Sequence, residues 1–428
     1  MTKRVSVVVG GGLAGLTAAI FLARGGQRAI LLEQSRELGG RSRTTDVNGY
    51  RLNFGPHALS MCEDAISVLR EIGIEPDGSR PSTAGVLVGS DRLHALPGSL
   101  GRILSTSALS LGSRLKFFGA VRRVMTANAT AADFTSAKDW LDANIEPEDL
   151  RKVIGAFFTL AAYSGDVDKV SAGMLLRRMQ STGQNVRYLH HGWAAMVDQL
   201  HRAAVSAGVE IRHGIAVRDL EVADGKVVAL VTANERIVAD NVVLAVPPDE
   251  ARRLASRHTP IVHTVAARAF CMDIALQSLP NPAIPFALGL EEPWYFSVHS
   301  ASARLAQGQG AVIHAARFLR EGEDTSRTRQ QLELLMDTLQ PGWRKVLVHA
   351  RVLPNIAVAG ALPLAQDGGE QGRQPVFSER VEGLAFAGDW VGPQGYLADA
   401  AFSSGRKAAL GLMARATLQG LTEFAHAV

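Results

Sequence analysis

The sequence has little cysteine, few aromatic residues, no long hydrophobic run and no dense cluster of one charge. Its 428 residues include only two cysteines, Cys62 and Cys271, which form no CxxC pair. This spacing argues against a disulfide framework and against a cysteine metal site, so we expect a reducing, cytoplasmic environment. The formal net charge is +4, and no Lys/Arg run is interleaved with aromatic residues, so nucleic acid is not an expected partner.

No segment contains the roughly 18 consecutive apolar residues that a membrane-spanning helix needs. The apolar run near the start, Val5–Val9, is followed at once by glycines, so we expect a strand and not a signal peptide. Peripheral contact with a membrane stays open. Hydrophobic residues make up 47% and charged residues 20%, an ordinary globular balance. The length favours two closely joined domains.

The first 33 residues predict a strand–helix–strand unit. Val5–Val9 and residues 28–33 have the continuous apolar character of strands buried on both faces of a parallel sheet, and residues 13–24 between them have the pattern of a helix. Gly10, Gly12 and Gly15 form GxGxxG between the first strand and the helix, and Glu33 ends the second strand. In this context the motif predicts a dinucleotide site, with Gly12 close to a pyrophosphate and Glu33 on the ribose hydroxyls.

The motif alone does not separate NAD from FAD. The stretch "ELGGRSRT" follows directly, and its Gly40 and Arg41 would bring a glycine backbone and a cation to the diphosphate or flavin, which favours FAD. A solvated surface charge is the alternative for Arg41.

Near the other end, "AGDWVGPQGYLADAAFSSG" combines a short apolar strand, a glycine loop and a helix of small residues. Small side chains let a helix pack tightly, and its free N-terminal amides carry positive partial charge. Aimed at a flavin, that charge would stabilise the reduced anion. A plain packing helix is the alternative.

With these motifs on view, the chain resembles the flavin-containing amine oxidase superfamily, particularly its phytoene-desaturase-like and protoporphyrinogen-oxidase-like branch. Four separated motifs carry the resemblance: GxGxxG with Glu33, "LGGRSRT", the block from "HGWAAMVDQL" to "ADNVVLAVPP", and "GLAFAGDWVGPQGYLADAAFSSGRKAA". It implies an α/β fold in which a Rossmann-type, GR2-like FAD-binding domain is interleaved with a mixed α+β substrate domain. We assign residues 1–75, 190–258 and 375–428 to the former, and 76–189 and 259–374 to the latter.

The resemblance also implies a role for individual residues around non-covalent FAD. The residues implied to contact the ADP half of FAD are Gly10, Gly12, Leu13, Ala14, Gly15 and Glu33. Gly40 and Arg41 would contact the diphosphate, Val217 the adenine, and Gly388 with Asp389 the ribityl or phosphate region. The residues implied to lie at the flavin ring are Gly55, Pro56, His57, Gly395, Tyr396, Leu397 and Ala400.

The sequence departs from the amine-oxidase pattern at two places. Such enzymes build an aromatic sandwich from the position of Tyr396 and from a segment about forty residues upstream, but "NIAVAGALPLA" here contains no aromatic residue. They also carry a lysine on a substrate-domain strand, whereas "TVAARAFCMDIAL" offers only Arg268, which we expect to face solvent. Ordinary amine oxidation therefore loses support.

We expect an FAD-dependent dehydrogenase that desaturates a hydrophobic or cyclic small molecule by hydride transfer to flavin N5, with O2 or a quinone as acceptor. An amine or amino-acid oxidase using O2 is the alternative, and a non-redox prenyl-binding protein of the same fold a remote one. His57 and Tyr396 are the candidate catalytic residues, although structural hydrogen bonding is the simpler role for His57. The pair His190-His191 has no companion at metal spacing, so no metal is expected.

One helical segment suggests a membrane interface. "LGSRLKFFGAVRRVM" combines Leu115, Phe117, Phe118 and Val121 with Arg114, Lys116, Arg122 and Arg123. It is read either as an interfacial helix through which a lipophilic substrate enters or, as is more common for such a stripe, as core packing with solvated basic ends.

Overall fold

The computed structural model describes residues 3–82, 84–182 and 185–427. A five-stranded parallel sheet holds the two motif-bearing ends of the chain together. Its order is β10 (Glu210–His213), β2 (Arg28–Glu33), β1 (Val5–Val9), β14 (Asn241–Leu244) and β20 (Leu384–Phe386). The predicted strand–helix–strand unit is confirmed, with α1 at Leu13–Arg24. Strands far apart in the sequence thus end at one edge of one sheet.

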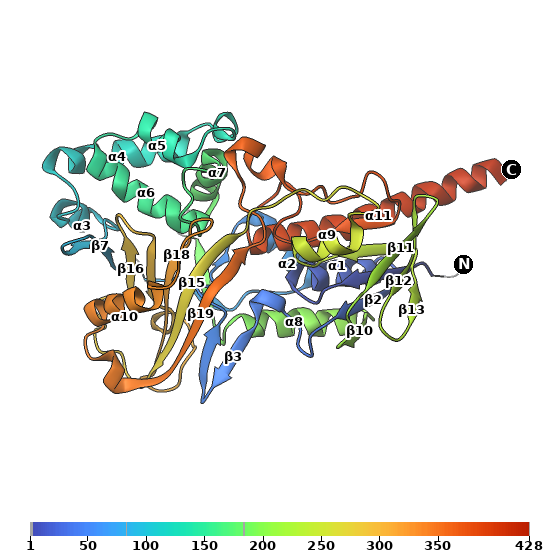
Figure 1. Ribbon diagram of the computed structural model, residues 1–428, viewed down its shortest axis with the longest axis horizontal. Coiled ribbons are helices and arrows are strands. Elements are labelled where there is room, and N and C mark those ends of the chain that lie inside the picture. Colours follow the sequence, from blue (N-terminus) through green and yellow to red (C-terminus); the bar gives the residue numbers. More distant parts are fainter. Residues whose placement is uncertain (1–2, 83, 183–184, 428) are drawn as a thin grey trace.

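Two helices, α1 and α11 (Ala398–Ala427), pack on this sheet and against each other (Figure 1). Helix α2 (Glu63–Ile72) packs on α11, α8 (Trp193–Ser206) packs on α1, and α9 (Pro248–Ala255) packs on the strand Asp219–Ala223. The small residues of α11 do allow close packing: a Cβ on Gly405 would lie 2.5 Å from the Ala14 carbonyl oxygen of α1. The antiparallel strands β11 (Asp219–Ala223), β12 (Lys226–Val231) and β13 (Arg236–Val238) form a meander that leads into buried β14.

A second, seven-stranded sheet lies beside the first (Figure 1). Its order is β19 (Leu347–Ala359), β15 (Ala267–Leu276), β18 (Ala311–Phe318), β17 (Trp294–Val298), β16 (Phe286–Gly289), β7 (Val86–Val88) and β8 (Leu93–Ala95). Helix α10 (Thr328–Leu339) packs on β15 and β18 of this sheet. The hairpin β7–β8 has strands of only three residues, which leave too short a pattern to recognise in the sequence.

Five helices form a cap over the second sheet: α3 (Leu100–Ser105), α4 (Leu111–Thr126), α5 (Ala137–Asn144), α6 (Glu148–Ala162) and α7 (Ala172–Thr182). Two small sheets, β3 (Thr44–Val47) with β4 (Tyr50–Asn53), and β5 (Leu59–Ser60) with β9 (Val186–Leu189) and β6 (Gly78–Ser79), lie between the larger parts. The expected α/β fold with a mixed α+β part is confirmed. None of the helices in the described ranges is long and apolar enough to span a bilayer.

Candidate functional site

The glycine loop after β1 shows why each glycine is needed. Gly10 has φ +104°, and a Cβ there would collide with the Ala245 carbonyl. A Cβ on Gly15 would collide with the carbonyl of Gly10, so this glycine lets α1 approach the loop. At Gly12, by contrast, a Cβ would meet nothing within 4 Å. The chain's own packing demands Gly10 and Gly15, whereas Gly12 keeps backbone open to a group outside the chain.

Glu33 is fixed beside this loop. Its side chain is buried, its Oε2 accepts from the Gly11 N–H at 2.6 Å, and its Oε1 accepts from the Ser35 N–H at 2.7 Å. Each carboxylate oxygen keeps a further lone pair for a ligand hydroxyl. The segment that carries Val217 lies next to it, because the Ile215 N–H donates to the Glu33 carbonyl at 2.9 Å. Val217 is itself buried, as are Leu13 and Ala14 at the start of α1.

Arg41 and Asp389 form an ion pair across 348 positions of sequence. Two guanidinium nitrogens of Arg41 lie 2.7 Å from the two carboxylate oxygens of Asp389, and the Gly360 N–H donates to the same carboxylate at 2.8 Å. Burial alone would raise the pKa of Asp389, but Arg41 and the amide outweigh it and lower that pKa. The Asp389 side chain is 4% exposed and that of Arg41 47%, so Arg41 is anchored at one side and open at the other.

A second arginine, Arg373, which the sequence analysis missed, holds the loop that follows Asp389. Its side chain donates to the Asp389 carbonyl at 3.1 Å and to the Gly395 carbonyl at 2.8 Å, and it is buried. Arg373 therefore ties the two ends of the turn 389–395 together. In the sequence it stands in a polar stretch, "GEQGRQ", that looks like any solvated loop.

Tyr396 points into the helical cap. It is 2% exposed, and its hydroxyl donates to the Ala162 carbonyl of α6 at 2.9 Å. The Arg178 guanidinium of α7 lies 5.4 Å from the Tyr396 ring centroid and 5.9 Å from that of Tyr163, which follows α6. Tyr396 and Tyr163 thus share one cation of the chain itself, and the second ring comes from the end of α6 and not from the segment 355–365. The next residue, Leu397, has φ +58°.

His57 is held in one orientation. Its Nδ1 lies 3.1 Å from the Gly55 carbonyl, and its ring meets that of Trp193 edge-on at 5.6 Å. Burial lowers its pKa to about 4, partly offset by the Gly55 bond, so the ring is neutral at pH 7. Gly55 has φ +82°, and a Cβ on it would press against Ile356 and Cys271 of the second sheet. The segment of Gly55, Pro56 and His57 therefore lies between the second sheet and α8.

A family model described as flavin containing amine oxidoreductase matches residues 13–271, more than half of the chain. The chain belongs to this family. The match begins at the α1 end of the glycine loop and extends into β15, so it includes Glu33, Arg41 and His57.

Individual relatives agree with this family assignment. A phytoene dehydrogenase of Streptomyces griseus is 24% identical over 93% of this chain and 84% of its own length. A Mycobacterium tuberculosis protein named as a flavin-containing monoamine oxidase is 26% identical, and the chain spans only about three fifths (59%) of its length. The solved structure of an oxidoreductase from Methanosarcina mazei superposes with a TM-score of 0.76 at 16% identity, covering 94% of this chain and 99% of that one. This last likeness concerns the fold.

The residues on view fit FAD, the cofactor of this flavin-containing family. Open backbone at Gly12 and the open side of Arg41 suit a diphosphate, and Glu33 beside the loop suits a ribose. Gly395 and Leu397 shape the turn before α11, and Ala400 is fully buried behind it. No set of three or more His, Cys, Asp or Glu side chains suited to a metal ion occurs in the described ranges.

One departure from the amine-oxidase pattern is confirmed in the structure: Arg268, the cation nearest the expected lysine position, is exposed and donates to the Asn355 carbonyl at 3.2 Å. It therefore points away from Gly55 and from the site.

A buried polar cluster behind Gly55 was not foreseen from the sequence. Asp273 accepts from Arg351 at 2.7 Å, lies 2.6 Å from the His314 Nδ1, and is fully buried together with His314. The His314 ring meets that of His299 edge-on at 4.5 Å, and His299 Nε2 lies 3.0 Å from the Tyr295 hydroxyl. Burial raises the pKa of Asp273, but His314 and Arg351 outweigh it and lower it. The sequence gives no sign of this cluster, because residues 273, 299, 314 and 351 stand far apart in the chain and come together only in the folded second sheet.

A second buried acid, Asp399, lies in the first turn of α11. It is 3% exposed, and its Oδ1 has no hydrogen-bond partner, like the buried Ser60 hydroxyl. Burial is the main reason why its pKa is raised to about 6, against the lowering effect of Arg178. Its neighbour Cys62 has a thiol pKa raised to about 11, mainly by burial.

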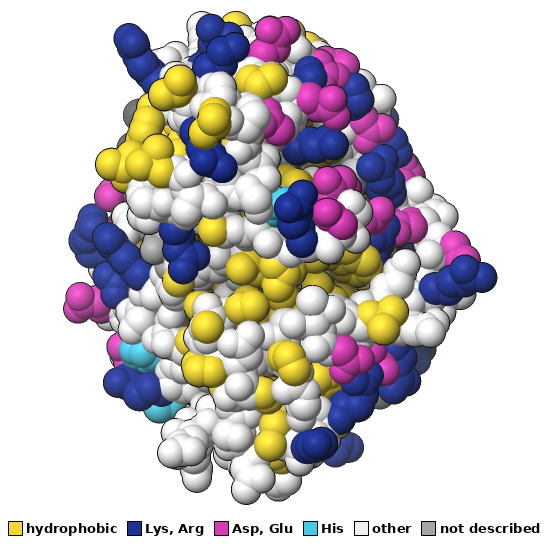
Figure 2. Space-filling view, turned by 90° about the vertical axis from the view of Figure 1, so that its left-hand side faces the viewer, with side chains coloured by type: hydrophobic (Ala, Val, Ile, Leu, Met, Phe, Trp, Pro, Cys, Tyr) yellow, Lys and Arg dark blue, Asp and Glu magenta, His cyan; other side chains and the backbone are white. Residues whose placement is uncertain are grey.

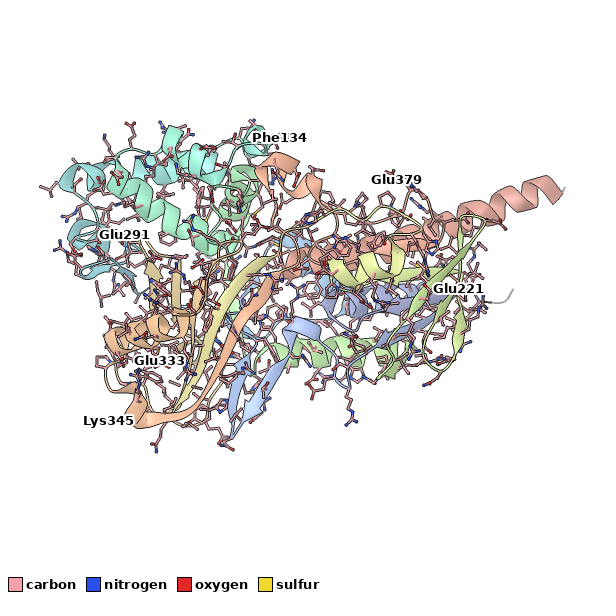
Figure 3. All side chains as sticks on the ribbon, in the orientation of Figure 1. Phe134, Glu221, Glu291, Glu333, Lys345 and Glu379 are labelled. Atoms are coloured by element: carbon pink, nitrogen blue, oxygen red, sulfur yellow. The ribbon has the colours of Figure 1, made fainter. Side chains whose placement is uncertain are left out.

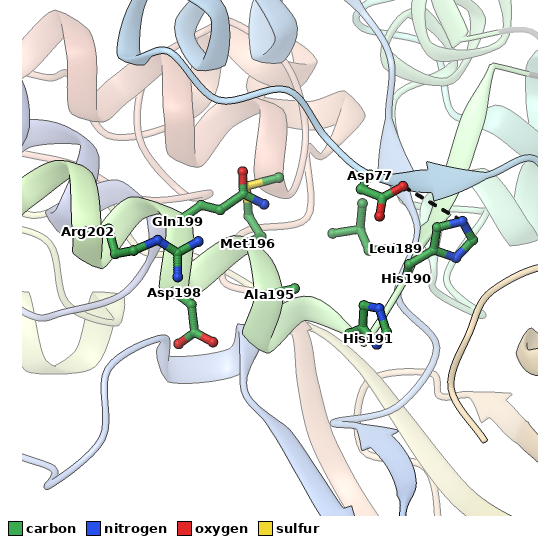
Figure 4. Close-up of a pocket in the computed structure, with 9 residues that line it drawn as sticks. All are labelled: Asp77, Leu189, His190, His191, Ala195, Met196, Asp198, Gln199 and Arg202. Atoms are coloured by element: carbon green, nitrogen blue, oxygen red, sulfur yellow. Dashed lines mark ion pairs between the residues drawn. The ribbon is translucent and has the colours of Figure 1, made fainter. Parts of the chain in front are cut away.

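The histidine pair lies in a separate pocket of about 290 Å³ (Figure 4). His190 Nδ1 accepts from the Arg304 N–H at 3.1 Å, its Nε2 lies 3.3 Å from the Ser79 hydroxyl, and Asp77 is 3.8 Å away. His190 thus joins three segments, while His191 is exposed at φ +63°. The other lining residues come mainly from α8, and none of them is a predicted FAD contact.

Proposed function

We propose that this protein is an FAD-dependent dehydrogenase that introduces a double bond into a hydrophobic or cyclic small molecule. FAD, when bound, supplies the hydride acceptor, its N5 atom. The substrate class rests on the buried cluster to which Tyr396 belongs, whose members are apolar or aromatic and include Leu362, Leu364 and Phe318. A relative named as a phytoene dehydrogenase, which matches nearly the whole chain, also supports it.

Arg178 is the observation that carries the choice between dehydrogenase and amine oxidase. In an amine oxidase the aromatic faces beside the flavin receive a substrate amine. Here the guanidinium of Arg178 lies over Tyr396 and Tyr163 at cation–π distance. A substrate ammonium would have to displace a cation or sit beside it, and like charges at such distances repel. A neutral apolar substrate meets no such repulsion.

We assign the chain's own residues the following parts. Neutral His57 positions the Gly55–His57 segment through its bond to the Gly55 carbonyl. Arg41, held by Asp389, supplies charge to the diphosphate, and Arg373 keeps the following turn in shape. Tyr396 positions the turn by donating to α6. The division into FAD-binding segments 1–75, 190–258 and 375–428 and substrate segments 76–189 and 259–374 remains part of this proposal, supported by the strands that each sheet takes from them.

An anaerobic titration tests the proposal. Apolar and cyclic candidates, including carotenoid precursors and cyclic terpenes, should bleach the oxidised flavin band, whereas primary, secondary and diamine substrates should not. Bleaching by amines alone would overturn it. Reoxidation with O2 or with a quinone then identifies the electron acceptor.

An amine oxidase stays the second candidate, because a relative is named as a monoamine oxidase and two tyrosine rings are present. Replacing Arg178 with Met or Lys separates the two. If Arg178 excludes ammonium groups, R178M should increase any reduction of the flavin by amines, and R178K should not. A colourless purified protein would instead favour the remote non-redox, prenyl-binding alternative.

A further inference from the structure

Helices α3 and α4 expose large apolar side chains along one surface. On α4, Leu111 is 76% exposed, Leu115 85% and Phe118 58%. Their spacings of four and three residues place them on one face of the helix. Leu100 and Leu104 of neighbouring α3 are more than half exposed as well. We call these five residues the α3–α4 apolar surface.

This surface is additional to the face that α4 buries. Phe117, Ala120 and Val124 of the same helix are buried in the core of the helical cap, as core packing would predict. An ordinary surface helix turns polar side chains to water on its other side. Here Leu115 and Phe118 face water as well, so the sequence-based preference for core packing holds for Phe117 and is wrong for these two.

The charge of the same segment has one sign. From residue 92 to residue 132 there is no Asp or Glu, and there are six basic residues, Arg92, Arg102, Arg114, Lys116, Arg122 and Arg123. Lys116 and Arg122 are exposed, and neither takes part in an ion pair within the part of the chain that the structure describes. Both lie in α4, which also carries Leu111, Leu115 and Phe118 of the apolar surface.

Arg114 has a different part, because it fixes the shape of this region. Its guanidinium donates to the carbonyls of Leu104, Thr106 and Leu109 at 2.7 to 3.1 Å. These bonds lock the end of α3 against the start of α4. The apolar surface is therefore presented by a fixed pair of helices. Figure 2 shows the side of the molecule that carries α3 and α4, where exposed hydrophobic side chains lie among Lys and Arg side chains.

We propose that the α3–α4 apolar surface docks on an anionic lipid bilayer. The two helices would lie in the plane of the interface, with Leu111, Leu115 and Phe118 among the upper acyl chains and Lys116 and Arg122 at the lipid phosphates. A second copy of the chain fits less well, since a two-fold contact through this surface would bring the same basic residues face to face. The inference is independent of the proposed reaction.

Vesicle co-sedimentation of the FAD-loaded protein tests this directly. We expect binding to phosphatidylcholine vesicles that contain phosphatidylglycerol, weak binding to pure phosphatidylcholine, and loss of binding as salt is raised, because screening weakens charge attraction. Each basic side chain near an anionic surface is worth roughly a fivefold change in partitioning. K116Q/R122Q should therefore weaken binding to the anionic vesicles by at least tenfold, and L115Q/F118Q should weaken it by a similar factor or more.

The matched control removes two other exposed apolar side chains, which lie elsewhere on the molecule. Val205 of α8 and Leu334 of α10 are 58% and 59% exposed. Glu333, the neighbour of Leu334, lies in the lower left part of the view, whereas α4 lies at the upper left (Figure 3). V205Q/L334Q should bind as the wild type does. Retained flavin absorbance and helical circular dichroism show that each variant is folded.

Three results would overturn the proposal. The first is no sedimentation with anionic vesicles, and the second is equal loss of binding in V205Q/L334Q. The third is a dimer in solution that L115Q/F118Q converts to monomer without a change in vesicle binding, since the occupant of the surface would then be a second copy.

Discussion

Ionisation of buried Asp399 should destabilise the folded protein, and the substitution Asp399→Asn makes this measurable. The carboxyl is 3% exposed with one oxygen unpartnered, and its pKa is raised from 3.8 to about 6. Because the folded state holds the proton more tightly than the unfolded state, the stability from this group is fully present below pH 3.8. It is lost as the pH rises through 6.

The magnitude follows from the shift. A difference of about two pKa units corresponds to roughly 3 kcal/mol between fully protonated and fully ionised protein. At pH 5 about half of this loss has already occurred, so roughly 1 kcal/mol should be lost between pH 5 and pH 7.5. Asparagine resembles the protonated acid and does not titrate. D399N should therefore gain roughly 1 kcal/mol relative to wild type over that interval.

Thermal unfolding of FAD-free protein at both pH values measures this difference. For a chain of this length, it corresponds to about 1 to 2 °C in unfolding temperature. Asp249, in the first turn of α9, is an exposed acid whose replacement by Asn gives the control and should leave the pH dependence of wild type unchanged. A gap between D399N and wild type that stays constant, or shrinks, from pH 5 to pH 7.5 would refute the reasoning.

Three further predictions concern the FAD site. Gly12→Ala should leave the unfolding temperature of FAD-free protein unchanged, because a Cβ at this position meets nothing within 4 Å. The same substitution should lower the affinity for FAD, measured by titration, at least tenfold, and an unchanged affinity would contradict the role of Gly12. Arg41→Met should lower the free energy of unfolding in urea by about 3 kcal/mol, because it leaves buried Asp389 without its cation. The double variant R41M/D389N should regain part of that stability, and no regain would argue against the ion pair. His57 has a pKa of about 4 in the folded state, so the unfolded state binds a proton first as the pH falls below about 6.5, and the folded protein should lose stability. The substitution H57Q should remove this loss, as measured by comparing the free energy of unfolding at pH 4.5 and pH 7.5.

Much of the FAD half could be predicted from the sequence because its signals are local. Gly10, Gly12 and Gly15 stand at fixed spacing between a buried strand and a helix, and Glu33 ends the next strand, so backbone geometry and sequence spacing carry the same information. The small residues of α11 likewise predicted a close helix–helix contact, and Gly405 makes this contact with α1.

The rest depended on contacts between residues far apart in the chain. Asp273, His299, His314 and Arg351 stand on different segments around the second sheet, and Arg373 in a polar loop, so no spacing marks them as partners. A second aromatic residue near Tyr396 was expected upstream in the segment 355–365, whereas the ring that shares Arg178 with Tyr396 is that of Tyr163, just after α6 in the helical cap.

By itself, then, the sequence determined the cofactor class and the parallel sheet, because a strand, a glycine turn and a helix are set by neighbouring residues. Only the tertiary structure decided which distant parts of the chain contact one another and which side chains stay exposed. The pairing of Arg41 with Asp389, the position of Arg178 over two tyrosine rings and the exposure of Leu115 and Phe118 all depend on which distant surfaces meet. Packing sets those contacts, and neither propensity nor spacing along the chain encodes them.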